Sequence, residues 1–179
     1  METILGLKIP EDGSYNPFYK RYIDLVAGRN LRDVSREQEE QVVSIFQPLT
    51  SSMGQVTYQT GKWSLNQVLG HIVDTEKIMH FRALCISRGE TAAFPGFDQN
   101  SYVKTAAFNN VSNQELLSSF LLNRQLFWQF IRTIPMEQWN GIGEVSGYPM
   151  SLHALVHIIF GHLEHHLVLI RQHYLPLLA

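Results

Sequence analysis

Apolar residues recur at steps of three and four in several long stretches of this chain, a spacing that is typical of helices burying one face. The three clearest stretches predict helices over about 65–87, 113–133 and 152–174. A serine that can act as N-cap precedes each of them: Ser64, Ser112 and Ser151. The chain is therefore expected to be all-α.

One more main helix, which precedes these three along the chain, is predicted to begin at Ser35. Gln38 stands three residues later and completes a capping box. Pro48 is expected to kink or end this helix, since proline lacks the N–H that the helix needs. A shorter helix is expected before it, capped by Asn16-Pro17 and ending near Gly28.

Two connections rich in glycine and proline separate the later helices. Residues 91–98 predict a loop that crosses one end of the bundle, and 141–149 are compatible with a small hairpin. No repeat or linker divides the 179 residues, so we predict one domain over 1–179 with an irregular lead-in over 1–14. The predicted fold is an antiparallel four-helix bundle.

Composition narrows the classes of protein. Hydrophobic residues make up 45% of the chain and charged residues 17%, as in globular proteins, and the net charge of -2 argues against a nucleic-acid partner. We expect no membrane partner, because no uninterrupted apolar run is long enough to span one. The start of the chain does not resemble a secretory signal, and the single cysteine, Cys85, cannot form an internal disulfide, so a cytoplasmic location is expected.

Histidines are concentrated in the last predicted helix. The chain has eight, and six of them follow residue 152: His153, His157, His162, His165, His166 and His173. With about 100° per residue, His162 and His166 fall on the inward, apolar face. His153 and His157 fall on the opposite face and are expected to be solvated.

His162 and His166 are four residues apart, so their Cβ atoms are expected to lie about 5–6 Å from each other. Two imidazoles at that spacing can bind one metal ion at about 2.0–2.1 Å each. The alternative is that each is an ordinary core histidine with hydrogen-bond partners, although two buried imidazoles on one apolar face need several such partners. The spacing alone leaves both interpretations open.

His71 is the candidate third ligand, because it lies at the edge of the apolar stripe of the 65–87 helix. Three histidine nitrogens from two helices would leave coordination positions open, as a catalytic metal site requires. His80 is expected to be solvated on the other side of that helix. His165, on the flank of the last helix, and His173, on its inner face but farther along, are predicted to have structural or supporting roles.

Three further residues could contribute to a site. Arg124 occupies a core position, so it is expected either to pair with Asp74 or Glu76 or to extend its guanidinium to the surface. Asp98 is expected to approach the metal, to accept a hydrogen bond from a ligand histidine, or to cap its loop. Cys85 is predicted to be a small core residue rather than a nucleophile.

Four segments, in this order and separation, resemble the DinB-like (DinB/YfiT) four-helix-bundle proteins. They are Gly61-Lys62-Trp63-Ser64, His71-Ile72-Val73-Asp74-Thr75-Glu76, Phe94-Pro95-Gly96-Phe97-Asp98-Gln99-Asn100 and Gly161-His162-Leu163-Glu164-His165-His166-Leu167. The resemblance covers roughly residues 15–174. It implies a bundle with a long connection between the second and third main helices.

The resemblance also implies a divalent metal, usually zinc or nickel and otherwise iron or manganese, held by His71, His162 and His166. Relatives of this kind include metal-dependent thiol S-transferases that use bacillithiol or mycothiol, and hydrolase- or isomerase-like enzymes. The resemblance therefore suggests that the partner is a small-molecule substrate, for which a low-molecular-weight thiol is a candidate. A homodimer is also compatible with the resemblance.

The leading hypothesis is a metal-dependent small-molecule enzyme of the thiol S-transferase or hydrolase type. The alternative is a non-catalytic bundle that binds a metal or ligand, and a fourth protein ligand on the metal would favour that alternative. A nucleic-acid-binding stress protein would need a basic patch that the charge count does not supply. Motifs of zincin proteases, di-iron bundles, P-loop NTPases and α/β-hydrolases are absent from the sequence.

Overall fold

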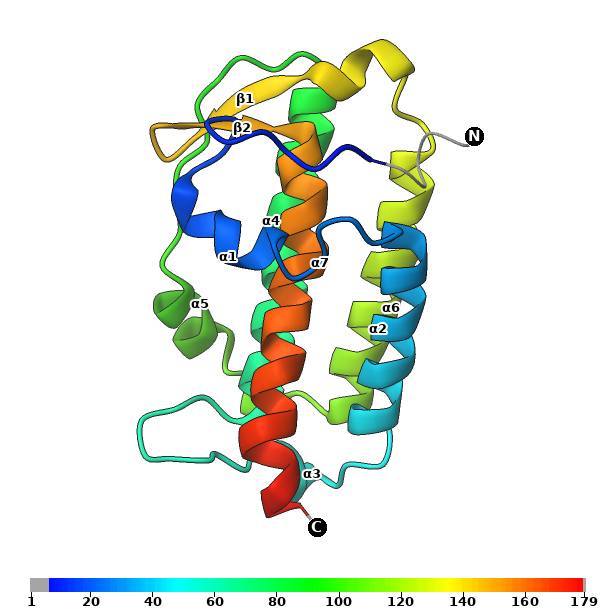
Figure 1. Cartoon of the computed structure of the whole chain (residues 1–179). Helices are drawn as coiled ribbons and strands as arrows, with labels where there is room; N and C mark the ends of the chain where they lie inside the picture. Colours follow the sequence, from blue (N-terminus) through cyan, green and yellow to red (C-terminus); the bar gives the residue numbers. More distant parts are fainter. Residues whose placement is uncertain (1–6, 179) are drawn as a thin grey trace.

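The computed structural model describes residues 7–178, and its four main helices form a bundle (Figure 1). These helices are α2 (Leu31–Phe46), α4 (Leu65–Ser87), α6 (Asn113–Ile131) and α7 (Leu152–Leu169). Both α6 and α7 pack against α4 and against α2. In Figure 1, α2 and α7 run in one direction and α4 and α6 in the other. The predicted all-α four-helix bundle is confirmed.

Shorter elements connect and extend the main helices. A 3₁₀ turn (Pro17–Tyr19) leads into α1 (Lys20–Ile23), and α3 (Ser51–Gly54) follows α2. Between α4 and α6 lie α5 (Gln99–Ala106) and a 3₁₀ turn (Phe108–Asn110). A 3₁₀ turn (Met136–Asn140), β1 (Ile142–Val145) and β2 (Tyr148–Ser151) precede α7. Residues 7–14 are irregular, while the rest of the predicted lead-in, 1–6, lies outside the described residues.

The serine caps explain why three of the main helices begin where the sequence predicts. The hydroxyls of Ser64, Ser112 and Ser151 each accept a backbone N–H three residues ahead. The first two belong to complete capping boxes, with Gln67 and Glu115 as the reciprocal partners.

The predicted start of α2 at Ser35 is wrong. The helix begins at Leu31, because the side chain of Asn30 accepts the N–H groups of Arg32 and Asp33 and caps it earlier. Ser35 lies one turn inside α2, where its hydroxyl accepts a hydrogen bond from the Trp128 indole at 2.8 Å.

The long connection between α4 and α6 explains why these two helices run in the same direction. Its first part lies against the hairpin, where the Phe94 N–H donates to Glu144 and the Ser146 N–H donates back to Phe94. The chain then descends along the bundle through α5 (Figure 1), a helix that the sequence analysis did not predict. The hairpin itself is confirmed, with Val145 paired to Tyr148 across a tight turn.

The end of α7 differs from a regular helix. Residues Ile170–Tyr174 form a π-helical turn, whose extra residue changes the direction of the side chains that follow. His173 is consequently exposed and stacks on Tyr58, although the helical wheel placed it on the inner face. By length and composition the segment Leu152–Leu177 could span a membrane, but 72% of its apolar window is buried inside the protein, as expected of the core helix of a bundle.

Two apolar clusters fill the bundle, and a polar layer separates them. One cluster contains Met79 of α4 and Phe127 of α6, and the other contains Leu69 and Phe120 of the same two helices. Buried polar side chains occupy the level between the clusters: Gln38, His71, Glu76, Asn123, Arg124 and His162. All four main helices contribute to this layer.

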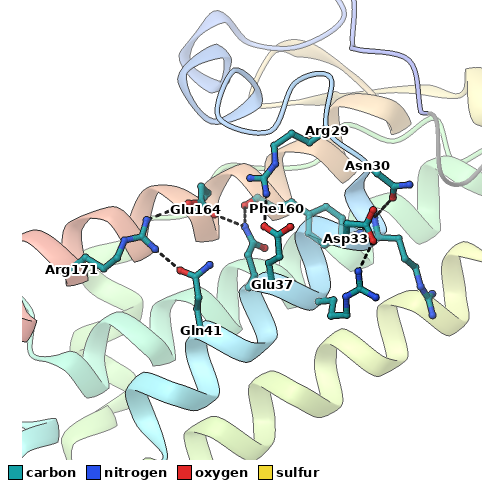
Figure 2. Close-up of polar contacts among 11 residues, drawn as sticks. Arg29, Asn30, Asp33, Glu37, Gln41, Phe160, Glu164 and Arg171 are labelled. Carbon is teal, nitrogen blue, oxygen red and sulfur yellow. Dashed lines mark hydrogen bonds and ion pairs between the residues drawn. The ribbon is translucent and has the colours of Figure 1, made fainter.

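Polar contacts attach α2 to α7 (Figure 2). The Gln38 amide donates to the Phe160 carbonyl at 2.8 Å and to Glu164 at 3.2 Å. Arg171, in the turn after α7, donates to Gln41 of α2 and to Glu164 of α7, as Figure 2 shows. The Gln38 bond is buried and gives the side-chain amide nitrogen a partner inside the bundle, whereas the Arg171 contacts are exposed and contribute little.

Gly161 allows α1 to pack closely on α7. A Cβ at this position would lie 2.0 Å from the carbonyl oxygen of Tyr22 and 2.5 Å from its carbonyl carbon. Only glycine leaves room for that backbone, and the contact places Tyr22 beside the following residue, His162.

We predict that Gly161→Ala destabilises the protein by about 1–3 kcal/mol, because the added methyl group forces the α1 backbone away. At an unobstructed helical position, the same change would stabilise by about 0.5–1 kcal/mol, so the sign of the effect is diagnostic. Urea unfolding followed by circular dichroism measures it, with Ser118→Ala on the exposed face of α6 as the control. A stabilised Gly161→Ala protein would contradict the packing described.

Candidate metal centre

Three histidine rings from two helices meet inside the bundle. The Nε2 atom of His162 lies 3.1 Å from Nε2 of His71 and 3.1 Å from Nε2 of His166. All three side chains are buried, and their candidate ligand atoms lie within 4.8 Å of one another. The structure therefore brings together the three residues that the sequence predicted as metal ligands.

The spacing of these nitrogens fits a shared ion. Two nitrogens that each bind one ion at about 2.0–2.1 Å are about 2.9–3.4 Å apart for angles between about 90° and 110°. The two separations of 3.1 Å fall inside that range. Without a cation, three ring nitrogens that face one another cannot all be paired as donor and acceptor, so either two lone pairs or two N–H groups must compete at the same point. The residues present fit a divalent metal.

Ring contacts and one hydrogen bond orient these histidines. The Nδ1 atom of His71 lies 3.4 Å from the Thr75 hydroxyl, so Nε2 of the same ring is the nitrogen that faces the other two histidines. The Trp63 ring lies 4.7 Å from that of His71, and the Tyr22 ring meets His162 edge-on at 5.4 Å. These two aromatic rings cover the cluster.

Burial keeps the three imidazoles neutral at pH 7. It lowers the pKa of His71 to about 4 and, together with the neighbouring histidines, the pKa of His166 to about 3. The pKa of His162 is also lowered, first by burial and then by His166 and His71. A neutral imidazole is the form that binds a metal, so the environment selects the ligand form.

The remaining histidines lie outside the cluster. His165 is half-buried and its ring contacts those of Tyr22 and His166. The expectation that His153 and His157 are solvated is wrong: His157 is buried and its Nδ1 bonds to the His153 carbonyl, while the His153 ring packs on Trp139.

The physical reason is that other elements cover the first half of α7, where every residue from 154 to 163 is buried. A helical wheel assumes one solvent face, which this central helix lacks at that level. His80 is likewise half-buried rather than solvated, because its ring packs on Phe130 of α6.

Arg124 and Glu76 form a buried ion pair beside the cluster. The Arg124 Nε donates to both carboxylate oxygens at 2.9 and 3.0 Å, and its Nη2 donates to one of them at 2.5 Å. Asn123 adds a further bond to this carboxylate. Of the two predicted partners, Glu76 is therefore correct, since Asp74 faces Lys77 instead. The pair links α4 to α6 within the polar layer.

A cavity of about 320 Å³ lies next to His71 and His162. Its other lining residues come from the α1 region, α4, α7 and the segment that leads into α5: Phe18, Tyr19, Arg21, Tyr22, Thr75, Met79, Phe97, Asp98, Gln99, Asn100 and Ile158. A second cavity, of about 270 Å³, is lined by His166 together with Trp63, Tyr58 and Tyr174. The histidine cluster therefore borders two cavities.

The structure decides between the alternatives for two other candidates. The Asp98 carboxylate accepts the N–H of Asn100 at 3.0 Å and caps α5, which confirms the capping role, and Asp98 also lines the 320 Å³ cavity. Cys85 is half-buried, so it is not the core residue that the pattern predicted, because α4 turns that side toward solvent near its end.

Sequence reasoning missed the residues that α1 supplies to the site. Tyr22 and Arg21 both line the cavity beside His162, yet they lie far from it in sequence. The one available signal was Gly161: a glycine within an apolar helix, directly before a candidate ligand, indicates that another backbone approaches there.

Comparisons with known proteins agree with this geometry. A family described as the DinB superfamily matches residues 36–170. The fold is similar to that of YfiT from Bacillus subtilis, with a TM-score of 0.71 and 16% identity over 91% of this chain and 89% of that one. YfiT is described as a probable metal-dependent hydrolase with an unusual four-helix bundle topology. No curated protein matches the sequence.

We predict that Arg124→Met destabilises the protein by about 3–5 kcal/mol, because it leaves the Glu76 carboxylate buried without its partner. The double variant Glu76→Leu with Arg124→Met is expected to recover most of that loss, since an apolar pair of similar volume can replace a buried ion pair. Urea unfolding of both proteins checks this, and Asp74→Asn, at the partly exposed pair with Lys77, serves as the control. Similar losses in the single and double variants would contradict it.

We also predict that the metal-free protein loses stability as the pH falls from about 6.5 towards about 4. Unfolded histidines take up protons near pH 6.5, whereas folded His71 and His166 do so near 4 and 3. In that window the unfolded state binds more protons, so the free energy of unfolding rises with pH and falls on acidification. Denaturation at several pH values measures the slope. This slope of the free energy of unfolding against pH should be shallower in His166→Leu. It should be unchanged in His173→Gln, because the His173 side chain is exposed.

Proposed function

This chain belongs to the DinB superfamily, and we propose that it is an enzyme in which His71, His162 and His166 hold one divalent metal ion for chemistry on a small molecule. The observation that carries the proposal is the meeting of three buried, neutral imidazole nitrogens beside a cavity. YfiT, which shares the fold, is described as a probable metal-dependent hydrolase, and this supports the same general class.

The ligand set favours a catalytic role over a structural one. Within residues 7–178, no cysteine, aspartate, glutamate or fourth histidine joins the cluster of His71, His162 and His166. Structural zinc sites usually have four protein ligands, whereas catalytic sites keep a position for water or substrate. Three nitrogen ligands suit zinc or nickel, with iron or manganese as the other candidates.

The bound ion would act as a Lewis acid and would lower the pKa of a water or thiol in its open position. The protein side chains have separate tasks. Thr75 orients His71 through Nδ1, and the rings of Tyr22 and Trp63 limit the access of water to the cluster. The 320 Å³ cavity gives a substrate access to the side formed by His71 and His162.

We propose that the nucleophile is either water, as in a hydrolase, or a low-molecular-weight thiol, as in an S-transferase. The second cavity, on the His166 side, supports the transferase version, because it offers a separate approach for a second reactant. The cytoplasm, where such thiols are reduced, is the proposed location of either activity.

We predict that the protein binds one equivalent of Zn²⁺ or Ni²⁺ and that His162→Ala abolishes this binding. His162 lies between the other two rings, so its removal leaves two nitrogens without the central ligand. Elemental analysis after purification without a histidine tag measures the metal content. His157→Gln, which removes a buried histidine outside the cluster, is expected to keep the metal.

Turnover tests the catalytic part of the proposal. The metal-loaded protein is assayed with amide or ester substrates, and with electrophiles in the presence and absence of a small thiol. Activity that requires the metal and is lost in His162→Ala supports an enzyme, and a strict requirement for the thiol identifies a transferase. Tight binding of the metal to a fourth protein ligand, with no turnover of any substrate class, would contradict the proposal.

A further inference from the structure

The outer wall of the 320 Å³ cavity combines aromatic rings with an arginine. Phe18, Tyr19 and Tyr22 line it from the α1 region, and Phe97 lines it from the segment before α5. Phe18 is 55% exposed, which is a large exposed fraction for a phenylalanine at the edge of a cavity. Flat apolar surface of this kind is typical of sites that bind aromatic or other planar groups.

Arg21 is held in place on this wall by two of the rings. Its guanidinium carbon lies 4.0 Å from the centre of the Phe18 ring and 4.8 Å from that of Tyr22. One of its nitrogens donates to the Tyr22 hydroxyl at 2.9 Å. A guanidinium has five N–H donors, and stacking on ring faces leaves those at its edge free to bind an anion.

No carboxylate neutralises Arg21, because among residues 7–178 it takes part in no ion pair. The same is true of Arg82, which is buried behind the same wall and donates to the Pro95 carbonyl and the Met79 sulfur. Met79 is itself a lining residue of the cavity. Two arginines without an anionic partner therefore lie at or just behind this wall.

The acidic groups of the site do not balance these charges. Among residues 7–178, Asp98 is the one acidic residue that lines the cavity, and its single negative charge, which also caps α5, offsets at most one of the two arginines. Glu76 is already paired with Arg124. The three imidazoles are neutral, so a bound divalent ion would keep its full charge. The cavity is therefore suited to a substrate that brings negative charge.

We propose that Arg21 is a substrate-binding residue that anchors an anionic group, such as a carboxylate, of a planar apolar substrate lying against the aromatic wall. The substrate would extend from Arg21 to the side of the cluster formed by His71 and His162. This inference rests on the proposed function for the reacting end of the substrate, but the anchoring end depends only on Arg21 and the rings beside it.

A purely structural role for Arg21 is the competing explanation, since its guanidinium also joins Phe18 to Tyr22. The two explanations predict different selectivities of the cavity for its ligands. A structural clamp affects all ligands of the cavity alike, whereas an anchoring arginine distinguishes a carboxylate from a neutral amide of the same shape.

The test compares 4-mercaptobenzoate with 4-mercaptobenzamide as probes of the Co²⁺-loaded protein. Both present a thiolate to the metal and an aromatic ring to the wall, so they differ in the anionic group alone. Dissociation constants come from the cobalt spectrum and from calorimetry. We expect the wild-type protein to bind the benzoate at least tenfold more tightly than the benzamide. Arg21→Gln should remove this preference while leaving the benzamide affinity unchanged, and Arg21→Lys should keep part of it.

Arg36→Gln is the matched control, because Arg36 is an exposed arginine of α2 that lies outside the cavity and pairs with Asp33. It should keep the full preference for the benzoate. Circular dichroism and urea unfolding establish that each variant is folded. An equal preference in wild type and Arg21→Gln, or no preference in the wild type, would overturn the assignment of Arg21.

The same experiment gives a different result if the proposed metal-dependent function is wrong. If the protein binds no Co²⁺, the metal proposal is wrong, and the two probes are compared by calorimetry on the metal-free protein. A preference for the benzoate that depends on Arg21 would then still support the anchor, and the lack of such a preference would reject it.

Discussion

The rest of the structure depends on one constraint: three neutral imidazoles face a common point in a buried position, and no carboxylate among residues 7–178 joins them. The arrangement needs α4 and α7 side by side at the level of His71 and His162. It also needs α1 pressed against α7, which Gly161 permits, so that the Tyr22 ring covers the cluster. The metal-binding geometry is thus a property of how the helices pack and of no single helix.

The polar layer at this level has a cost in stability, and the buried ion pair limits that cost. Arg124 is fully buried, and a guanidinium in that position is tolerated only because the Glu76 carboxylate accepts hydrogen bonds from its Nε and Nη2 atoms, while Asn123 donates to the same carboxylate. Since Glu76 shares α4 with His71, the pair also fixes the position of that helix against α6. An apolar layer would give more stability, but it would not hold α4 in register through directional bonds.

Local rules predicted the features that local interactions determine. The spacing of His162 and His166, the hairpin and three of the four predicted serine caps depend on neighbours in sequence, and the structure agrees with them. Features that depend on tertiary context were predicted less well. The burial of His157 follows from elements that cover α7, and the orientation of His173 follows from a π-helical turn. The contribution of Arg21 could not be predicted, because no sequence pattern places α1 beside His162.

Charge connects the cluster to the substrate that it would accept. A site with carboxylate ligands would partly neutralise its ion, whereas three neutral imidazoles leave the full positive charge facing the cavity. Arg21 and Arg82 add to this charge, and the single negative charge of Asp98 offsets only part of it. The aromatic rings of the outer wall displace part of the water around these charges, so interactions with an anion are stronger there than in bulk solvent. The ligand chemistry of the metal and the charge of the substrate are therefore both consequences of how few acidic side chains the described residues place at this site.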